Sequence, residues 1–455
     1  MSLRSLSVLS AQLTVPRTSD PVAGRLTPND SRGGQMSDRA RVLIIVQNLS
    51  VPMDRRVWLE CQALVAEGHE VSVICPKGPG DAAHEELAGV HIRRYRPAPP
   101  VRGALGYAYE FAYSWLRTAL LSVKVHQRCG FDVIQACNPP DTYWLLARLW
   151  RRSGVRFVYD QHDLNPELFL SRFGTPKGLS GRIQYRGLLW LERQTYKTAD
   201  HVISTNESYA SIARSRGGKA PEQVSVVRSG PDTSRMKPEE PDLSLREGAD
   251  SLLVYLGIMG PQDDVDQLLL VMDELVNRRG RGKVRLALLG FGDCLDELKA
   301  QAIELGLEGN VQFTGRVGLP DITRYLSTAD IGLGPDLKTP LNDLSTMNKT
   351  MEYMAYGLPT ISFDLREVRC SAGEVGIYVE SGDVAAFADE VEKLLDDPQR
   401  RARLGALGRQ RAEDVLDWRA QAAVYTSVYS ELGAGQSSAS GHDATVVAES
   451  MSAGD

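Results

Sequence analysis

The sequence lacks the features of a membrane-spanning or secreted protein. No stretch of about 20 residues is continuously apolar and free of charge, so the sequence predicts no transmembrane helix. Residues 1–35 contain no continuous apolar core, which excludes a secretory signal peptide. The six cysteines are scattered and form no CxxC pair, which favours reduced thiols in a reducing compartment over disulfides. We therefore expect a cytoplasmic protein, with a disordered extension over 1–38 and a disordered polar tail over 433–455.

Several signatures of known enzyme classes are also missing. The sequence has no HExxH, no Walker A motif, no GxSxG and no internal repeat of solenoid length, which argues against a zinc protease, a P-loop NTPase, a serine hydrolase and a repeat array. What is present is an ordinary globular composition. The 455 residues are 42% hydrophobic and 24% charged, enough for two or three domains that each have a core.

Positive charge is scarce in the second half of the chain. Residues 36–236 hold 27 basic and 19 acidic residues, whereas residues 237–455 hold 21 basic and 37 acidic residues. The first half therefore suits an anionic partner, such as lipid head groups or a phosphorylated acceptor, and a solvated surface without a partner is the alternative. The aromatic-rich window Gly103–Val125 predicts a helix that lies on a membrane surface or packs on the core. We expect no nucleic-acid partner, and a peripheral position on the inner face of the membrane fits this pattern.

Short apolar runs alternate with helical patterns along the chain, which predicts two doubly wound α/β domains in series. The first domain is expected over 39–235, the second over 250–415, and a helix over 416–432 is expected to cross back to the first domain. The predicted strands are Val42–Val46, Val71–Cys75, Val90–Tyr95, Asp132–Ala136, Arg156–Asp160, His201–Thr205, Val224–Val227, Leu252–Gly257, Val284–Gly290, Val311–Gly315, Asp330–Gly334 and Pro359–Phe363. Such sheets bind ligands in the crevice at the carboxyl ends of their strands, so we expect the site between the domains.

The most informative segment is TMNKTMEYMAYGLP at Thr346–Pro359. A helix is predicted to begin near Ser345, and its free N–H groups could hold a phosphate. Lys349 would add positive charge in the first turn, and Glu352, about two turns from Ser345, could accept two ribose hydroxyls. An amphipathic helix with incidental charges is the alternative interpretation.

This segment and other segments of the sequence resemble those of a known family. NKTMEYMAYGLPTISFD resembles the nucleotide-sugar signature of glycosyltransferase family 4, and RVLIIVQNLSVPMDRRVWLECQ, YDQHD, VVRSGPD, LVYLGIMG, LALLGFGD and VQFTGRV resemble other motifs of that family in the same order. The resemblance covers about Arg41 to Glu431. It implies the GT-B fold, with two Rossmann-like domains facing across a cleft. It also implies retaining transfer from a nucleoside-diphosphate sugar, with no cofactor and no required metal.

The resemblance also implies residue roles. His162, which follows the strand Arg156–Asp160, would orient or stabilise the donor sugar, and Lys349 would join it as a catalytic residue; a buried structural histidine is the alternative for His162. The donor would be bound by Gly257, Gly290, Gly292, Arg316, Val317, Ser345, Asn348, Lys349 and Glu352. For the acceptor we select polar residues that follow strands on the cleft side, with a capped loop and a surface arginine pair as the alternative. These are Asn48, Asp54, Arg55, Arg56 and Asn138.

Two departures from the family pattern concern charge. Leu344 stands where the first Glu of the family's E-x7-E motif would fall, and Ile258 and Asp263 occupy the places of a basic pair. The diphosphate charge would then be met by the helix N-terminus and Lys349, supplemented by Lys338, Arg228 or Arg316. Asp264-Val265-Asp266 forms a DxD, which we interpret as a helix start capped by Asp264 and not as a metal site.

The sequence thus predicts a retaining glycosyltransferase, with a glycan or lipid-linked acceptor for an envelope polysaccharide or exopolysaccharide. Two other functions stay open on sequence alone. One is a nucleotide-sugar-binding protein with little catalysis, and the other is a sugar-nucleotide epimerase on the same fold.

Overall fold

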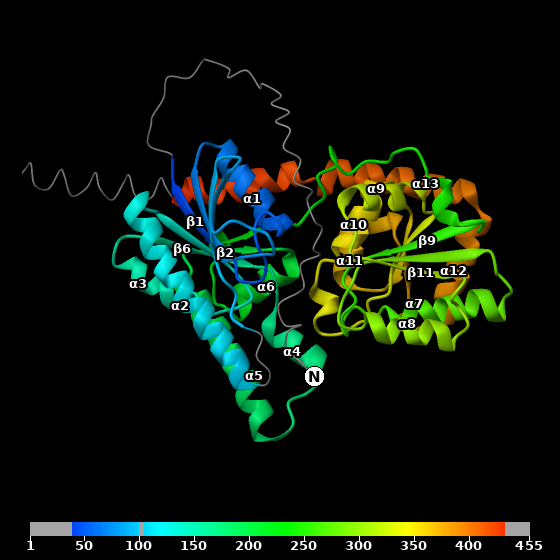
Figure 1. Ribbon diagram of the computed structural model, residues 1–455, viewed down its shortest axis with the longest axis horizontal. Helices are drawn as coiled ribbons and strands as arrows, with labels where there is room; N and C mark the ends of the chain where they lie inside the picture. The colour runs from blue at the N-terminus through cyan, green and yellow to red at the C-terminus, as the bar shows by residue number, and fades with distance from the viewer. Residues whose placement is uncertain (1–38, 100–103, 433–455) are drawn as a thin grey trace, which may run out of the picture.

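A computed structural model describes residues 39–99 and 104–432; the expected disordered extension over 1–38 and tail over 433–455 lie outside the described residues. Two α/β domains follow one another along the chain (Figure 1). Each has a central sheet with helices on both faces, so the predicted doubly wound architecture is confirmed.

The N-terminal domain is built on an eight-stranded sheet in the order β3-β4-β2-β1-β5-β6-β7-β8. All neighbouring strands are parallel except β3 and β4. Its strands are β1 (Arg41–Ile45), β2 (Glu70–Pro76), β3 (His84–Leu87), β4 (Val90–Tyr95), β5 (Val133–Cys137), β6 (Arg156–Gln161), β7 (His201–Ser204) and β8 (Val224–Val226). Its helices are α1 (Arg55–Ala66), α2 (Ala104–Arg128), α3 (Trp144–Arg151), α4 (Asn165–Phe173), α5 (Gly178–Thr198) and α6 (Glu207–Ser215).

The C-terminal domain has a six-stranded, wholly parallel sheet in the order β11-β10-β9-β12-β13-β14. Its strands are β9 (Ser251–Leu256), β10 (Val284–Leu289), β11 (Val311–Gly315), β12 (Ile331–Gly334), β13 (Thr360–Phe363) and β14 (Ile377–Val379). Its helices are α7 (Asp266–Asp273), α8 (Leu295–Glu304), α9 (Leu319–Thr328), α10 (Asn348–Ala355), α11 (Arg366–Ala372), α12 (Val384–Asp396) and α13 (Pro398–Arg411). A π-helical turn, Glu274–Arg278, extends α7, and a second one, Ala412–Leu416, follows α13.

The strands are apolar because both faces of each sheet are covered by helices. In β1, four of five residues are buried, and the central strand β9 is buried over all but its first residue. Each sheet therefore separates two apolar clusters, one on each face.

The last helix, 418–432, returns to the N-terminal domain, and we call it the crossover helix (Figure 1). It is drawn in red over the left-hand domain, near α1. Trp418, Tyr425, Val428 and Tyr429 of this helix join the apolar cluster that includes Val57 of α1. The chain therefore connects the domains twice, once before β9 and once after α13.

Three expectations about local structure were wrong. Strands β3 and β14 were missed, because one is polar and the other has only three residues. The helix expected from Ser345 begins at Asn348 instead, because the backbone is extended at Ser345 and Met347. Asp264 does not cap α7; its carboxylate accepts a hydrogen bond from the Leu337 N–H at 2.8 Å.

Candidate active site

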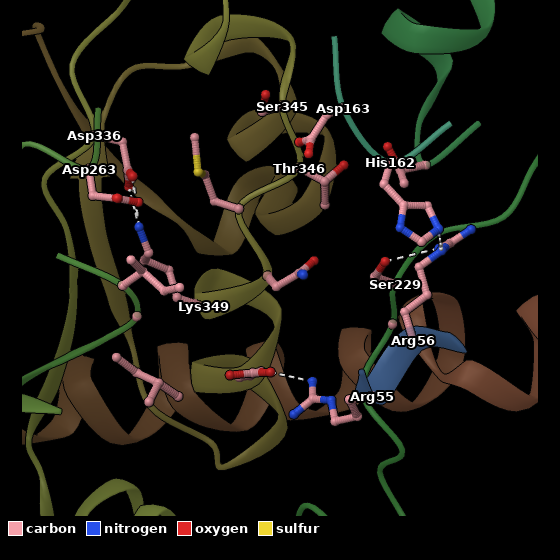
Figure 2. A pocket seen from close by; sticks show the side chains of 18 of the residues that line it. Arg55, Arg56, His162, Asp163, Ser229, Asp263, Asp336, Ser345, Thr346 and Lys349 are labelled. Carbon is pink, nitrogen blue, oxygen red and sulfur yellow. Dashed lines mark hydrogen bonds and ion pairs between the residues drawn. The ribbon is translucent and has the colours of Figure 1, made fainter. Parts of the chain in front are cut away.

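A cleft of about 1420 Å³, part of it open to solvent, lies between the two domains. The N-terminal domain contributes the loops that follow β1, β6, β7 and β8, the first two turns of α1, and Tyr209 of α6 to the lining. The rest comes from the loops that follow β9 and β12, the first two turns of α10, and Trp418 of the crossover helix. These loops sit at the carboxyl ends of parallel strands, where open α/β sheets bind their ligands. In the close-up, Lys349 and His162 lie on opposite sides of this space (Figure 2).

Most of the residues selected from the sequence meet in this cleft. They are Asn48, Asp54, Arg55, Arg56, His162, Gly257, Ser345, Asn348, Lys349 and Glu352. Five others do not belong to the lining: Asn138, Gly290, Gly292, Arg316 and Val317.

The glycines outside the lining act in packing. A Cβ on Gly290, whose φ is +152°, would lie 1.7 Å from the carbonyl oxygen of Gly257, and one on Gly292 would lie 2.4 Å from that of Met259. The loops after β9 and β10 therefore touch backbone to backbone, which only glycine permits. The Arg316 guanidinium stacks 4.2 Å from the centre of the Phe291 ring.

The first turn of α10 faces the cleft, with Asn348 and Lys349 in the lining. Met347 precedes the helix and offers no side-chain hydrogen bond to the first-turn N–H groups, which leaves them without a cap of the usual kind. Ser345 is engaged elsewhere. Its hydroxyl donates to the Leu341 carbonyl at 2.8 Å and lies 2.9 Å from the Tyr209 hydroxyl of the other domain.

Lys349 is held by a carboxylate of its own domain. Its ammonium lies 2.7 and 2.9 Å from the two carboxylate oxygens of Asp336, and 5.0 Å from the centre of the Tyr255 ring (Figure 2). Asp263 faces the same group, and burial raises its pKa to about 7, against the opposing effect of Lys349. The lysine charge is thus neutralised within the C-terminal side of the cleft.

Asp336 was missed by the sequence reasoning, although a signal was present. It follows β12 after one intervening residue, much as Asn48 follows β1 after two. A polar residue shortly after an apolar strand is the same pattern that pointed to Asn48 in the first domain.

His162 is the partly exposed member of an otherwise buried network of charged residues. Its Nε2 lies 2.7 Å from Asp160 Oδ2 and 3.1 Å from Arg56 Nε. Burial alone would lower the pKa of His162, but the Asp160 carboxylate outweighs it and the net shift is upward. Burial opposes ionisation of Asp160, yet His162 and Arg56 hold its pKa below the ordinary value. Asp160 therefore stabilises the protonated form of the imidazole, whereas Arg56 disfavours it.

The network continues through Gln135 to the crossover helix. The Gln135 amide donates to Glu60 and to Asp160, both at 2.8 Å, and its oxygen accepts hydrogen bonds from the hydroxyls of Tyr425 and Tyr429. Burial, reinforced by Asp160, raises the pKa of Glu60 to about 8.

Ligand atoms of Glu60, Cys137, Asp160 and His162 lie within 4.8 Å of one another. The Arg56 guanidinium lies 2.9 Å from Glu60 and 3.2 Å from Asp160, so a protein cation already occupies the centre of this acidic group. This occupancy argues against a metal ion there.

Arg56, an acceptor candidate, belongs to this network, and two other acceptor candidates beside it also have structural partners. Asp54 is buried and caps α1, since its carboxylate accepts from the Val57 N–H at 3.1 Å. Asn138 accepts from the N–H groups of His162 and Asp163, at 2.7 and 3.1 Å, and so fixes the loop that carries the histidine. Asn48 and Arg55 remain as cleft-lining candidates.

The domains touch around the cleft. Asn206, which caps α6, donates to the Leu344 carbonyl at 2.8 Å and to the Thr346 hydroxyl at 3.0 Å. Leu344 packs against an apolar cluster drawn from both domains, with Leu164, Leu168 and Tyr209 on one side and Leu341 on the other. The leucine at this position therefore contributes to domain contact.

Comparison with known proteins accounts for both halves of the chain. Residues 53–230 match the model of a glycosyl transferase 4-like domain, and residues 250–397 match the model of the glycosyl transferases group 1. The chain is a group 1 glycosyltransferase of the GT4 type. This enzyme is 24% identical over 304 residues to D-inositol 3-phosphate glycosyltransferase from Corynebacterium efficiens, covering 63% of this chain and 68% of that one. It is 30% identical over 206 residues to the GDP-mannose-dependent alpha-(1-6)-phosphatidylinositol monomannoside mannosyltransferase of Mycolicibacterium smegmatis, covering 43% and 53% of the two chains.

Solved structures agree on the fold. Sucrose-phosphate synthase from Thermosynechococcus elongatus superposes with a TM-score of 0.71 at 19% identity, over 87% of this glycosyltransferase and all of that chain. HepE from Anabaena, solved in complex with UDP-glucose, gives 0.65 at 17% identity, over 86% of this chain and all of that one. The predicted GT-B fold of family 4 is thereby confirmed.

Proposed function

We propose that this glycosyltransferase moves a sugar from a nucleoside-diphosphate sugar to a glycan or lipid-linked acceptor, with retention of anomeric configuration and without a metal. One observation supports it above others: a single cleft brings the first turn of α10 and Glu352 from one domain opposite His162 from the other. An anionic leaving group and a sugar ring can therefore be held together between them.

Each group has a proposed part in the reaction. Glu352 accepts the ribose hydroxyls, and the uncapped N–H groups at the start of α10 bind the diphosphate as it leaves. His162, oriented by Asp160, donates a hydrogen bond to the donor sugar. As the family resemblance implies, the acceptor hydroxyl attacks from the N-terminal domain on the face that the phosphate leaves: the new glycosidic C–O bond forms as the sugar–phosphate bond breaks, and the hydroxyl proton passes to the departing phosphate oxygen. Closure of the cleft excludes water and so limits donor hydrolysis.

We also propose that α2 and α5 of the N-terminal domain rest on an anionic membrane. Among the described residues, no helix is both long and apolar enough to cross a bilayer. Several apolar side chains of α2 and α5 are nonetheless exposed, namely Tyr109, Phe111, Leu116, Leu120, Leu179, Ile183 and Trp190. Basic residues accompany them on the same two helices: Arg117, Lys124, Arg182, Arg186 and Arg193. Apolar insertion combined with positive charge is typical of binding to anionic lipid surfaces.

The membrane contact has a matched test. Ile183 on α5 and Ile303 on α8 of the other domain are both 60% exposed. Ile183→Asp should reduce sedimentation with vesicles that contain phosphatidylglycerol, because a charge replaces an inserting side chain, whereas Ile303→Asp should not. Equal behaviour of the two variants would refute the proposed surface.

The function is tested by screening UDP-, GDP- and ADP-sugars for an increase in melting temperature, because a ligand of the folded state stabilises it. The donor that binds is then incubated with a membrane extract, with and without EDTA, and the anomeric proton of the product is read by NMR. Transfer with retention that resists EDTA is expected. Binding without transfer would instead indicate a binding protein, and donor interconversion without acceptor would indicate an epimerase.

A further inference from the structure

The donor half of the cleft has little positive charge to offer a diphosphate. Among the described residues, three permanently charged cations line the cleft: Arg55, Arg56 and Lys349. Lys349 is neutralised by Asp336, and Asp263 stands beside it. The second half of the chain, whose acidic excess the sequence showed, therefore presents no uncompensated cation in this lining.

Arg56 is equally committed to its own domain. It is buried, and its guanidinium contacts Glu60, Asp160, the Val227 carbonyl and the Ser229 hydroxyl, the last two at 2.9 Å. No N–H of this group can turn to a ligand without breaking the network that holds His162.

Arg55 differs from both. It begins α1, and its Nη2 crosses the domain boundary to form an ion pair with Glu352 of α10 (Figure 2). Its Nη1 is buried and has no hydrogen-bond partner. A buried guanidinium nitrogen without an acceptor is costly, and an arginine fork commonly uses its second nitrogen for a carboxylate or phosphate oxygen. Arg55 as a residue lines the cleft, so the unpartnered nitrogen belongs to a side chain that stands beside the carboxylate that we assign to the ribose.

We propose that Arg55 supplies the positive charge for the donor diphosphate, with Nη2 kept on Glu352 and Nη1 bound to a phosphate oxygen. In any nucleoside diphosphate the first phosphate is joined to the ribose, so one guanidinium can bridge the ribose-binding carboxylate and that phosphate. The inference rests on the proposed function and moves Arg55 from the acceptor side, where the sequence placed it, to the donor side. The missing basic pair of the C-terminal domain is replaced by a cation from the opposite domain.

The test compares diphosphates with nucleosides. Dissociation constants for UDP, GDP and ADP, and for uridine, guanosine and adenosine, are measured by ligand-observed NMR on the wild-type protein and on Arg55→Met. Removal of the charge should weaken the preferred diphosphate about 10- to 100-fold and change its nucleoside less than about 3-fold. Its affinity should also depend less on salt than in the wild type. Arg55→Lys, which keeps the charge but not the fork, should fall between the two.

Arg403→Ala, an exposed arginine on α13, serves as the control and should leave both affinities unchanged. If Arg55→Met weakens the affinities for diphosphate and nucleoside equally, Arg55 acts only by holding the two domains together, and the inference is overturned. An unchanged diphosphate affinity with a raised KM for the acceptor would overturn it in favour of the acceptor role. If the wild-type protein binds none of the three diphosphates, the proposed function fails and the role of Arg55 fails with it.

Discussion

Replacement of Asp160 by asparagine should both destabilise the N-terminal domain and lower the proton affinity of His162. Asp160 is buried and contacts His162, Arg56 and Gln135. Asparagine has nearly the same shape, so the change removes the negative charge that faces Arg56 and His162. Breaking a buried ion pair from one side costs about 3–5 kcal/mol, and the retained amide hydrogen bonds favour the lower figure.

The assay can isolate this domain. All six tryptophans lie in the N-terminal domain or on the crossover helix: Trp58, Trp115, Trp144, Trp150, Trp190 and Trp418. Tryptophan fluorescence in urea therefore follows the unfolding of this part of the chain. With a slope of about 2 kcal/mol per molar urea, a loss of about 3 kcal/mol lowers the midpoint by about 1.5 M.

A second measurement separates charge from packing. In the wild type the pKa of His162 is raised because Asp160 outweighs burial, whereas in Asp160→Asn burial and Arg56 should lower it below the ordinary value of about 6.5. Titration of the His162 resonances by NMR measures this directly. The control is Asp132→Asn, which removes a partly exposed pair with Arg41 and should cost about 1 kcal/mol or less. An Asp160→Asn protein with a wild-type midpoint and a raised His162 pKa would refute the network.

Three further results are expected. Glu352→Ala should weaken the affinity for nucleosides, because the carboxylate that we assign to the ribose is lost, and unchanged binding in an NMR titration would show that assignment to be wrong. Leu344→Glu, which restores the carboxylate of the family motif, should lower turnover and the melting temperature by loosening the apolar contact between the domains; increased turnover would contradict this. Stability should rise as the pH falls from 8 to 6, because burial raises the pKa of both Asp163 and Asp263 to about 7. Such carboxyls bind protons more tightly in the folded state than in the unfolded state, so they favour folding less as the pH rises through 7; a flat urea midpoint between pH 6 and 8 would argue against these shifts.

The sheets could be predicted because buried parallel strands appear in the sequence as short, continuous apolar runs. Runs such as VLIIV and LALLG are apolar on both faces, and strands were predicted there within a few residues of their observed ends. Strand β3 has no such apolar run. Its sequence, HEEL, is polar because the strand lies at the edge of the sheet, paired with β4 alone.

Only those residues of the candidate site that a local sequence pattern indicates could be predicted. Strand ends located His162 and Asn48, because the carboxyl ends of parallel strands share one edge of a sheet. The partners of the charged groups could not be found in this way. Arg55 and Glu352 are separated by 297 positions and belong to different domains. Their pairing depends on the angle between the domains, which contacts such as Asn206 to Leu344 help to fix.

The difference in net charge between the two domains bears on nucleotide binding in the cleft between them. In the proposed function the acidic C-terminal domain supplies the carboxylate for the ribose and a helix N-terminus for the phosphates, while its cleft lysine forms an ion pair with Asp336. The basic N-terminal domain brings Arg55 to the same place. If Arg55 is the diphosphate cation, an open enzyme binds the nucleotide weakly and a closed enzyme binds it well, since the two parts of the donor site meet only on closure. Donor binding would then favour the closed form by the difference between those affinities. The leaving group would gain its charge stabilisation only when water is already excluded, which favours transfer over hydrolysis.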